Sequence, residues 1–195
     1  MNFLAHIYLS GPEEHLLVGN FLADFISNKE VSKLPPDIQK GVKMHRQIDS
    51  FTDQHPMVKQ SAKRLHKAHG KYAPVILDVF HDFLLAQNWG RYSSQPLELF
   101  AADVYEVLLR HLPIMPEFLH DRLPRMIADD WLVRYGTEDG LRFTFSRVKL
   151  RSSAPHFFEN AVESLTNHYN EFNDEFNSFF PDMIDDVNPL LLPAK

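Results

Sequence analysis

The chain has no cysteine, which excludes disulfide bonds, thiolate metal sites and a cysteine nucleophile. It has no apolar run near the roughly 20 residues of a membrane span, and no basic segment precedes its apolar start. We therefore expect neither a signal peptide nor a membrane contact, and predict a cytoplasmic protein. No nucleic-acid-binding motif is present, and the net charge of −6 argues against a nucleic-acid partner. The 195 residues, 44% hydrophobic and 24% charged, predict one globular domain over residues 1–195.

Lysine and arginine are also missing from a long part of the chain. Neither occurs between Ser152 and Ala194, whereas residues 29–71 carry ten lysines and arginines against four acidic residues. This segment has a local charge of +6, which leaves −12 for the rest of the chain. Two solvated helix faces would explain this distribution. The alternative is that segment 29–71 meets an acidic partner or a phosphate group.

Strand signals are weak, and no Asn-Gly or Asp-Gly turn is flanked by alternating apolar residues. Apolar residues instead recur at helical spacing, and prolines and glycines mark helix ends. The predicted helices span residues 14–27, 36–53, 56–70, 74–89, 96–111, 115–135 and 155–180. The sequence therefore predicts an all-α fold of about seven helices.

The predicted helix 74–89 carries polar residues where an apolar helix should have none. Asp78 lies three residues before His81 and four before Asp82, which places the three on one face among Val, Ile, Leu and Phe. Buried carboxylates and imidazoles are costly unless they are paired or bind a cation. This helix is therefore predicted to form one wall of a metal site.

Two other predicted helices carry similar residues. His45 and Asp49 lie four residues apart on the inward side of helix 36–53, and Asp24 is the only charge in an apolar run of helix 14–27. Imidazole and carboxylate ligands together suit Mn²⁺, Fe²⁺ or Zn²⁺, and a carboxylate majority favours Mn²⁺ or Mg²⁺. The predicted metal ligands are Asp24, His45, Asp49, Asp78, His81 and Asp82.

Structural alternatives stay open for the single residues. His45 taken alone is more often a hydrogen-bonded core residue than a ligand, and Asp49 could be the ion-pair partner of Arg46 or Lys43. Asp53 could have a purely structural role, as the cap of the turn before Pro56. His6 is expected to be structural or exposed.

Four segments together resemble the acyl carrier protein phosphodiesterase family. They are residues 1–10 (MNFLAHIYLS), 19–25 (GNFLADF), 44–56 (MHRQIDSFTDQHP) and 76–86 (ILDVFHDFLLA). The run His-Arg-x-Ile-Asp-x-x-Thr-Asp, from His45 to Asp53, is the most specific of these motifs. Matches are dense in the first half of the chain, and in the second half they are limited to residues 130–132 and 134–135.

This resemblance implies an HD-domain-like fold, distantly related to the His-Asp metal phosphohydrolases. It implies a Mn²⁺-dependent enzyme, with Mg²⁺ or Fe²⁺ as alternatives, that removes 4′-phosphopantetheine from a serine of holo acyl carrier protein. Arg46 would neutralise charge on the phosphoryl oxygens, and Asp53 or His55 would protonate the serine leaving group. The family more often has an aromatic residue at position 81 and a histidine at 83, where this chain has His81 and Phe83.

Carrier proteins are acidic around the modified serine, so the resemblance implies that holo acyl carrier protein docks on segment 29–71. Two other functions stay open. An HD-like phosphohydrolase acting on a nucleotide or another small phosphodiester would be active without the carrier protein. A helical binding protein without enzymatic activity would keep its affinity after Asp78→Ala and after chelation.

Overall fold

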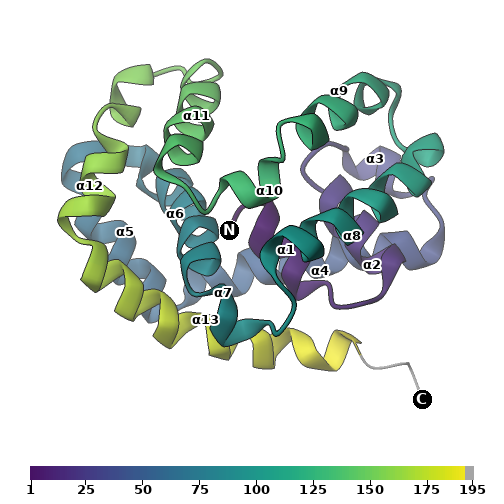
Figure 1. The fold of residues 1–195 in the computed structure, drawn as a ribbon, viewed down its shortest axis with the longest axis horizontal. Coiled ribbons are helices and arrows are strands. Elements are labelled where there is room, and N and C mark those ends of the chain that lie inside the picture. The colour runs from purple at the N-terminus through teal and green to yellow at the C-terminus, as the bar shows by residue number, and fades with distance from the viewer. Residues whose placement is uncertain (192–195) are drawn as a thin grey trace.

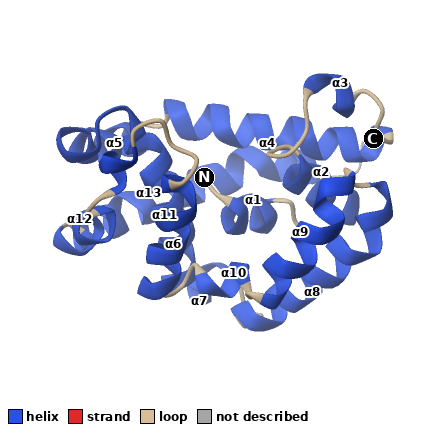
Figure 2. Cartoon of the chain, turned by 90° about the horizontal axis from the view of Figure 1, so that it is seen from above, coloured by secondary structure: helices blue, strands red, loops and turns tan. Residues whose placement is uncertain are grey.

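The computed structural model describes residues 1–191, and within that range it contains helices and no β-strand, which confirms the all-α prediction (Figures 1 and 2). The α-helices are α1 (Phe3–Leu9), α2 (Glu14–Leu22), α3 (Asn28–Val31), α4 (Pro36–Gln54), α5 (Pro56–His69), α6 (Ala73–Gln87), α7 (Trp89–Tyr92), α8 (Leu97–His111), α9 (Glu117–Ala128), α10 (Trp131–Arg134), α11 (Glu138–Lys149), α12 (Ala161–Asn167) and α13 (Tyr169–Leu191). Three 3-10 helices, η1 (Gly70–Tyr72), η2 (Leu112–Ile114) and η3 (Pro155–Phe158), lie between them. A helix suited to crossing a lipid bilayer is absent from residues 1–191. The predicted domain also includes residues 192–195, which lie outside the described residues.

The helix count exceeds the predicted seven because long predicted helices are divided and short ones are added. Helices α4, α5, α6 and α8 begin and end within two residues of their predictions. Predicted helix 115–135 breaks at Asp130, and predicted helix 155–180 breaks at Asn160, two residues with positive φ angles of 46° and 57°. Such a left-handed residue interrupts the right-handed helix. Helices α1, α3, α7 and α11 were not predicted.

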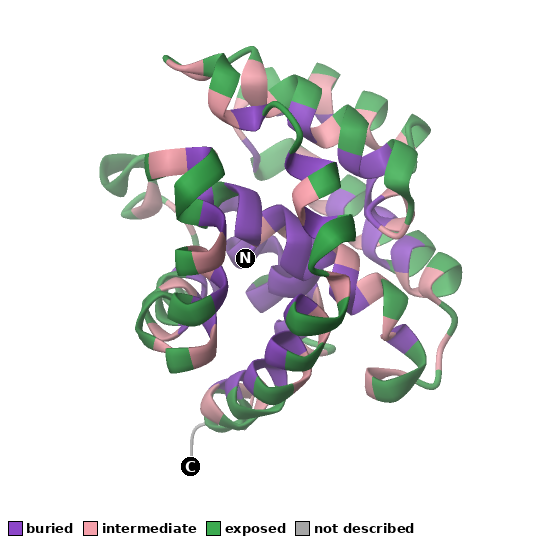
Figure 3. Ribbon diagram, turned by 90° about the vertical axis from the view of Figure 1, so that its left-hand side faces the viewer, coloured by how far each residue is buried: buried purple, intermediate pink, exposed green. Residues whose placement is uncertain are grey.

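The last helix, α13, runs along one edge of the molecule and reaches Leu191 despite Pro181 in its interior (Figure 1). A proline inside a helix removes one backbone hydrogen bond. The buried side of α13 compensates for this loss, because Phe179, Phe180 and Met183 are at most 1% exposed (Figure 3). Burying each such side chain is worth about 1.5–3 kcal/mol. Tertiary packing therefore keeps α13 helical although Pro181 disfavours a helix at that position.

Helices α2 and α4 meet backbone to backbone at Gly19 and Gly41. A Cβ atom on Gly19 would overlap the carbonyl oxygen of Ile38 and lie 2.8 Å from the Cα of Gly41. Only glycine permits this approach. Asn20 follows Gly19, and His45 lies one turn after Gly41, so the close contact brings these two polar residues to the same junction.

Candidate metal centre

Two histidine rings stack at the junction of α1, α2 and α4. The ring centroids of His6 and His45 are 4.0 Å apart, with 19° between the ring planes. Their side chains expose only 3% and 9% of their surface. Because burial penalises a charged imidazole, the pKa of His6 is lowered to about 4. His6 is therefore neutral at physiological pH.

The side chain of Asn20 is fully buried beside both histidines and fixes their ring protons. Its amide nitrogen donates to the main-chain oxygen of His6 at 2.8 Å and to Ser10 Oγ at 2.9 Å. Its Oδ1 atom therefore faces the histidines, 3.0 Å from His6 Nδ1 and 2.9 Å from His45 Nδ1. Since an amide oxygen only accepts, each Nδ1 donates. In a neutral ring this leaves a bare lone pair on Nε2.

The two Nε2 atoms point at carboxylates. His6 Nε2 is 3.2 Å from Asp49 Oδ1. His45 Nε2 is 3.2 Å from Asp49 Oδ2 and 3.6 Å from Asp24 Oδ1. The contact of His6 Nε2 is not aligned as a hydrogen bond, and this buried atom has no hydrogen-bond partner within residues 1–191. A bare imidazole nitrogen facing a carboxylate oxygen is repelled by it unless a cation lies between them.

A pocket of about 280 Å³, the metal pocket, opens in front of these groups. It is lined by Met1, Asp24, His45, Asp49, Thr52, Asp53 and Asp78. The side chains of Asp24, Asp49 and Asp78 are 41%, 46% and 39% exposed, so the carboxylates face solvent while the histidines behind them are buried. Such a small acidic space suits a hydrated cation better than an organic molecule.

The acids of the metal pocket differ in their electrostatic surroundings. The Met1 ammonium group donates a 2.9 Å hydrogen bond to Asp78 Oδ1. Burial raises the pKa of Asp78 against the effect of this ammonium group, and it raises the pKa of Asp24 against the effect of His45. For Asp49, burial also opposes ionisation, but a proton carried on Nε2 of His45 or His6 would outweigh it, and the pKa of Asp49 is lowered. Asp49 is therefore the most readily ionised of the three.

The donor set fits a divalent cation. Three potential ligand atoms lie within 4.8 Å of one another: one ring nitrogen of His6, one ring nitrogen of His45 and one carboxylate oxygen of Asp49. Two imidazoles and a carboxylate, with further carboxylates nearby, are ligands suited to Mn²⁺, Fe²⁺ and Zn²⁺. Asn20 lies where an outer partner would orient a metal-binding histidine through its second nitrogen.

The structure brings together in this pocket four of the residues predicted as ligands: Asp24, His45, Asp49 and Asp78. Asp82 lies elsewhere. Its two carboxylate oxygens accept the backbone N–H groups of Leu4 at 2.8 Å and Ala5 at 3.1 Å, at the start of α1. Burial raises the pKa of Asp82 to about 7, and these two backbone donors oppose the shift. Asp82 thus anchors the helix that carries His6.

His81 also lies outside the metal pocket. Its ring packs against Phe176 and Phe179 of α13, with centroid distances of 5.9 and 5.4 Å. It is 2% exposed, and its Nδ1 atom has no partner among residues 1–191. Burial lowers its pKa well below the usual range, so His81 is a neutral ring in an aromatic environment. The polar residues of α6 therefore point at three different neighbours rather than at one site.

Of the predicted catalytic residues, Asp53 lines the metal pocket, whereas Arg46 and His55 do not. Arg46 is exposed and donates a hydrogen bond to Asn28 Oδ1 on α3. His55 caps the start of α5, and its Nε2 atom lies 3.2 Å from Asp182 Oδ2 on α13. Both side chains thus connect helices away from the pocket.

The sequence predicts that His6 is structural or exposed and assigns Asn20 no role in the site. Both residues carry the signal that selected His81, a polar side chain inside an apolar run. His6 lies among Leu4, Ala5 and Ile7, and Asn20 lies beside Phe21. The signal was present, but it does not separate a residue that faces the pocket from one that faces the core.

Comparisons with known proteins identify the family. The family described as acyl carrier protein phosphodiesterase matches residues 1–183. Proteins named acyl carrier protein phosphodiesterase from Escherichia coli O6:H1 strain CFT073 and O45:K1 strain S88 are each 31% identical over 189 residues, which is 96% of this chain and 98% of theirs. No solved structure matches the chain. The chain therefore belongs to the acyl carrier protein phosphodiesterase family.

Proposed function

We propose that the chain is a metal-dependent phosphodiesterase that releases 4′-phosphopantetheine from the modified serine of holo acyl carrier protein. One observation carries the proposal: the Nε2 atoms of His6 and His45 face Asp49 at the back of an acidic, solvent-open pocket. A divalent cation bound between these groups would be a ligand partner for all three. The names of the Escherichia coli relatives support the carrier protein as the substrate.

We infer Mn²⁺ as the cation, with Mg²⁺ or Fe²⁺ as alternatives. His6, His45 and Asp49 would hold it, and Asp24 and Asp78 lie close enough to contribute oxygen ligands. A divalent cation bound there would polarise a phosphoryl oxygen and make a water molecule a better nucleophile near neutral pH.

The residues of the chain account for the other requirements of hydrolysis. Water adds to phosphorus, the bond between phosphorus and the serine oxygen breaks, and the serine oxygen takes up a proton. Asp53 lies on the wall of the metal pocket and would donate this proton. The products would be apo carrier protein and free 4′-phosphopantetheine.

The basic segment 29–71 would act at longer range. Lys59, Lys63 and Lys67 are exposed on α5 and do not line the metal pocket, so they would attract an acidic carrier protein without touching the reacting group. Reversing the three charges should raise KM and weaken its dependence on salt. An unchanged KM would remove this role.

The proposal is tested by intact mass spectrometry of holo acyl carrier protein after incubation with the purified protein, with Mn²⁺ or with chelator. We expect loss of the phosphopantetheine mass only with the metal. Asp49→Ala should abolish the reaction while helix content is kept, and Asp174→Ala, which changes an exposed acid on α13, should not. Hydrolysis of small phosphodiesters without any action on the carrier protein would refute the proposed substrate.

A further inference from the structure

A second and larger pocket, the arginine pocket, adjoins the metal pocket. It has a volume of about 950 Å³ and lies between α9 and α11, against Phe3 of α1 and Trp131 of α10. Five arginines line it: Arg122, Arg125, Arg134, Arg147 and Arg151. Three acids, Asp24, Asp121 and Asp129, also line it, so the charge of the lining is positive. Asp24 lines both pockets, so a group bound in the arginine pocket would lie beside the metal pocket.

The five arginines lack acidic partners in the described chain. No carboxylate of residues 1–191 forms an ion pair with any of them, whereas Arg110 pairs with an acid at 2.5 Å and Arg142 with one at 2.6 Å. Aromatic rings lie against three of them: the Arg122 guanidinium group is 4.9 Å from the centre of the Phe25 ring, and those of Arg134 and Arg147 are 4.3 and 5.9 Å from the centre of the Phe143 ring. Such a ring holds a guanidinium group in place without neutralising its charge.

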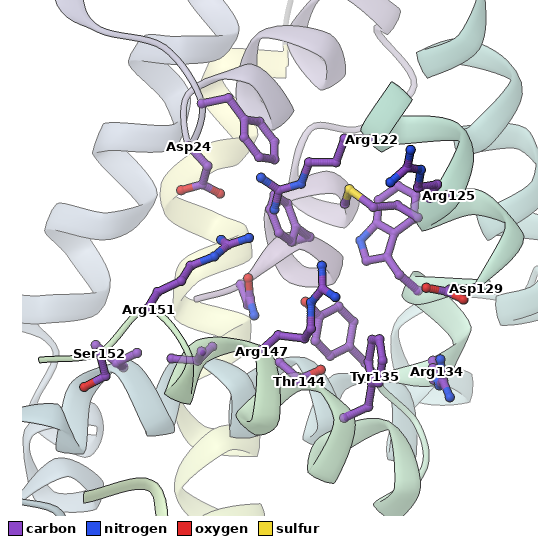
Figure 4. A pocket seen from close by; sticks show the side chains of 18 of the residues that line it. Asp24, Arg122, Arg125, Asp129, Arg134, Tyr135, Thr144, Arg147, Arg151 and Ser152 are labelled. Atoms are coloured by element: carbon purple, nitrogen blue, oxygen red, sulfur yellow. The ribbon is translucent and has the colours of Figure 1, made fainter. Parts of the chain in front are cut away.

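Three of these groups reach toward a common space. Figure 4 shows Arg122, Arg147 and Arg151 extending from opposite walls toward the region near Asp24. Burial together with the positive charges of Arg151 and Arg147 lowers the pKa of Arg122. Like charges held this close repel one another, and an anion placed between them relieves the repulsion. The pocket is therefore arranged for a negatively charged ligand.

The number and spread of the arginines indicate which kind of anion binds. A single phosphate group is satisfied by two or three guanidinium groups. Here five come from α9, α10, α11 and the residues after α11, around a space far larger than one phosphate. The pantetheine arm is uncharged beyond its phosphate and would not need them. Several carboxylates distributed over a protein surface match the pattern better.

We propose that the arginine pocket docks the acidic surface of acyl carrier protein next to its modified serine, and so presents the phosphodiester to the metal pocket. This inference rests on the proposed function for the identity of its partner. Charge complementarity supplies both the attraction and the orientation. Contact through Arg122, Arg147 and Arg151 is distinct from the long-range role of segment 29–71.

The test separates binding from turnover. Labelled holo acyl carrier protein is titrated with the full-length protein in chelator, and fluorescence anisotropy gives Kd. Arg147→Glu and Arg151→Glu change exposed residues, so both variants should keep the helix content of the parent. Each should raise Kd about tenfold, and the double variant more. Arg91→Glu is the matched control, because Arg91 is exposed, unpaired within residues 1–191 and outside both pockets; its Kd should stay within about twofold.

Turnover measurements and a carrier protein with reversed charges complete the test. With Mn²⁺, the Arg147→Glu variant should show a raised KM and a kcat close to that of the parent. A carrier protein whose acidic residues near the serine are replaced by lysine should bind more tightly to the Arg147→Glu variant than to the parent protein. Equal Kd values for Arg147→Glu and Arg91→Glu would overturn the docking proposal. Inhibition of turnover by inorganic phosphate is measured for the same variants. If Arg147→Glu weakens this inhibition but leaves Kd for the carrier protein unchanged, the pocket is a small-anion site and the docking proposal is overturned. If Kd rises as expected but no protein releases phosphopantetheine, docking holds and the proposed reaction fails.

Discussion

The role of Asn20 gives the sharpest test of the metal centre. Its side chain makes four hydrogen bonds: two as a donor, to the main-chain oxygen of His6 and to Ser10 Oγ, and two as an acceptor, from Nδ1 of His6 and of His45. Each is worth about 1 kcal/mol net. His45 Nδ1 keeps a 3.1 Å contact with the main-chain oxygen of residue 20, which a substitution preserves. Asn20→Ala should therefore lower the free energy of unfolding by about 3–5 kcal/mol, measured by urea denaturation in chelator.

The same change should also weaken metal binding, because the ring protons of His6 and His45 lose the partner that fixes them. Loss of such an outer partner typically reduces metal affinity 10–100-fold. Isothermal titration with Mn²⁺ measures this directly. Asn88→Ala is the control: this half-buried amide bonds to Asn173 and Leu84, away from the pocket, so it should cost stability but not Mn²⁺ affinity. Unaltered Mn²⁺ affinity in Asn20→Ala, with stability within 1 kcal/mol of the parent, would refute the assignment of the histidine protons.

Three further changes test the packing. Gly19→Ala should destabilise the fold by about 2–3 kcal/mol, since its Cβ would meet backbone, whereas Gly90→Ala, with nothing within 4 Å, should be neutral or stabilising; equal urea midpoints would contradict the close contact. Although burial opposes ionisation of Glu175, hydrogen bonds from Arg64 lower its pKa. Its carboxylate therefore stabilises the fold above the ordinary glutamate pKa, and the stabilisation is lost as pH falls through the lowered value. Glu175→Gln should cost about 1–3 kcal/mol at pH 7 and less near pH 3; a constant difference across this range would refute the linkage. His81→Phe should raise stability by about 1 kcal/mol and leave turnover intact, because it removes an unpartnered buried nitrogen; lost turnover would place His81 in the site.

Helix ends were predictable where side chains or proline determine them. Pro36 and Pro56 start α4 and α5 at the predicted residues. The breaks at Asp130 and Asn160 were not predictable from apolar periodicity, because a left-handed residue leaves no periodic signal. Helix α11 was missed for a related reason: few of its residues are large, apolar and buried, chiefly Leu141 and Phe145.

The candidate site was predictable in part. Helical spacing places His45 and Asp49 on one face of α4, and both reach the metal pocket. Spacing alone could not separate Asp78 from Asp82, which lie one turn apart but contact the Met1 ammonium group and the start of α1. The neighbour that each residue meets is a property of tertiary packing. His6 was missed because its helix, with seven residues, is too short for a periodic pattern.

The backbone contact between Gly19 and Gly41 also bears on how the protein folds. The contact joins α2 to α4, and His6, Asn20, His45 and Asp49 all belong to one short stretch of the chain around it. Contacts between residues close in sequence require little loop closure and tend to form early in folding. Most of the metal centre can thus assemble while a ribosome is still synthesising the second half of the chain. The arginines of the arginine pocket belong to residues 122–151, which are made later, so the surface proposed to recognise the carrier protein would be added to residues that are already in place.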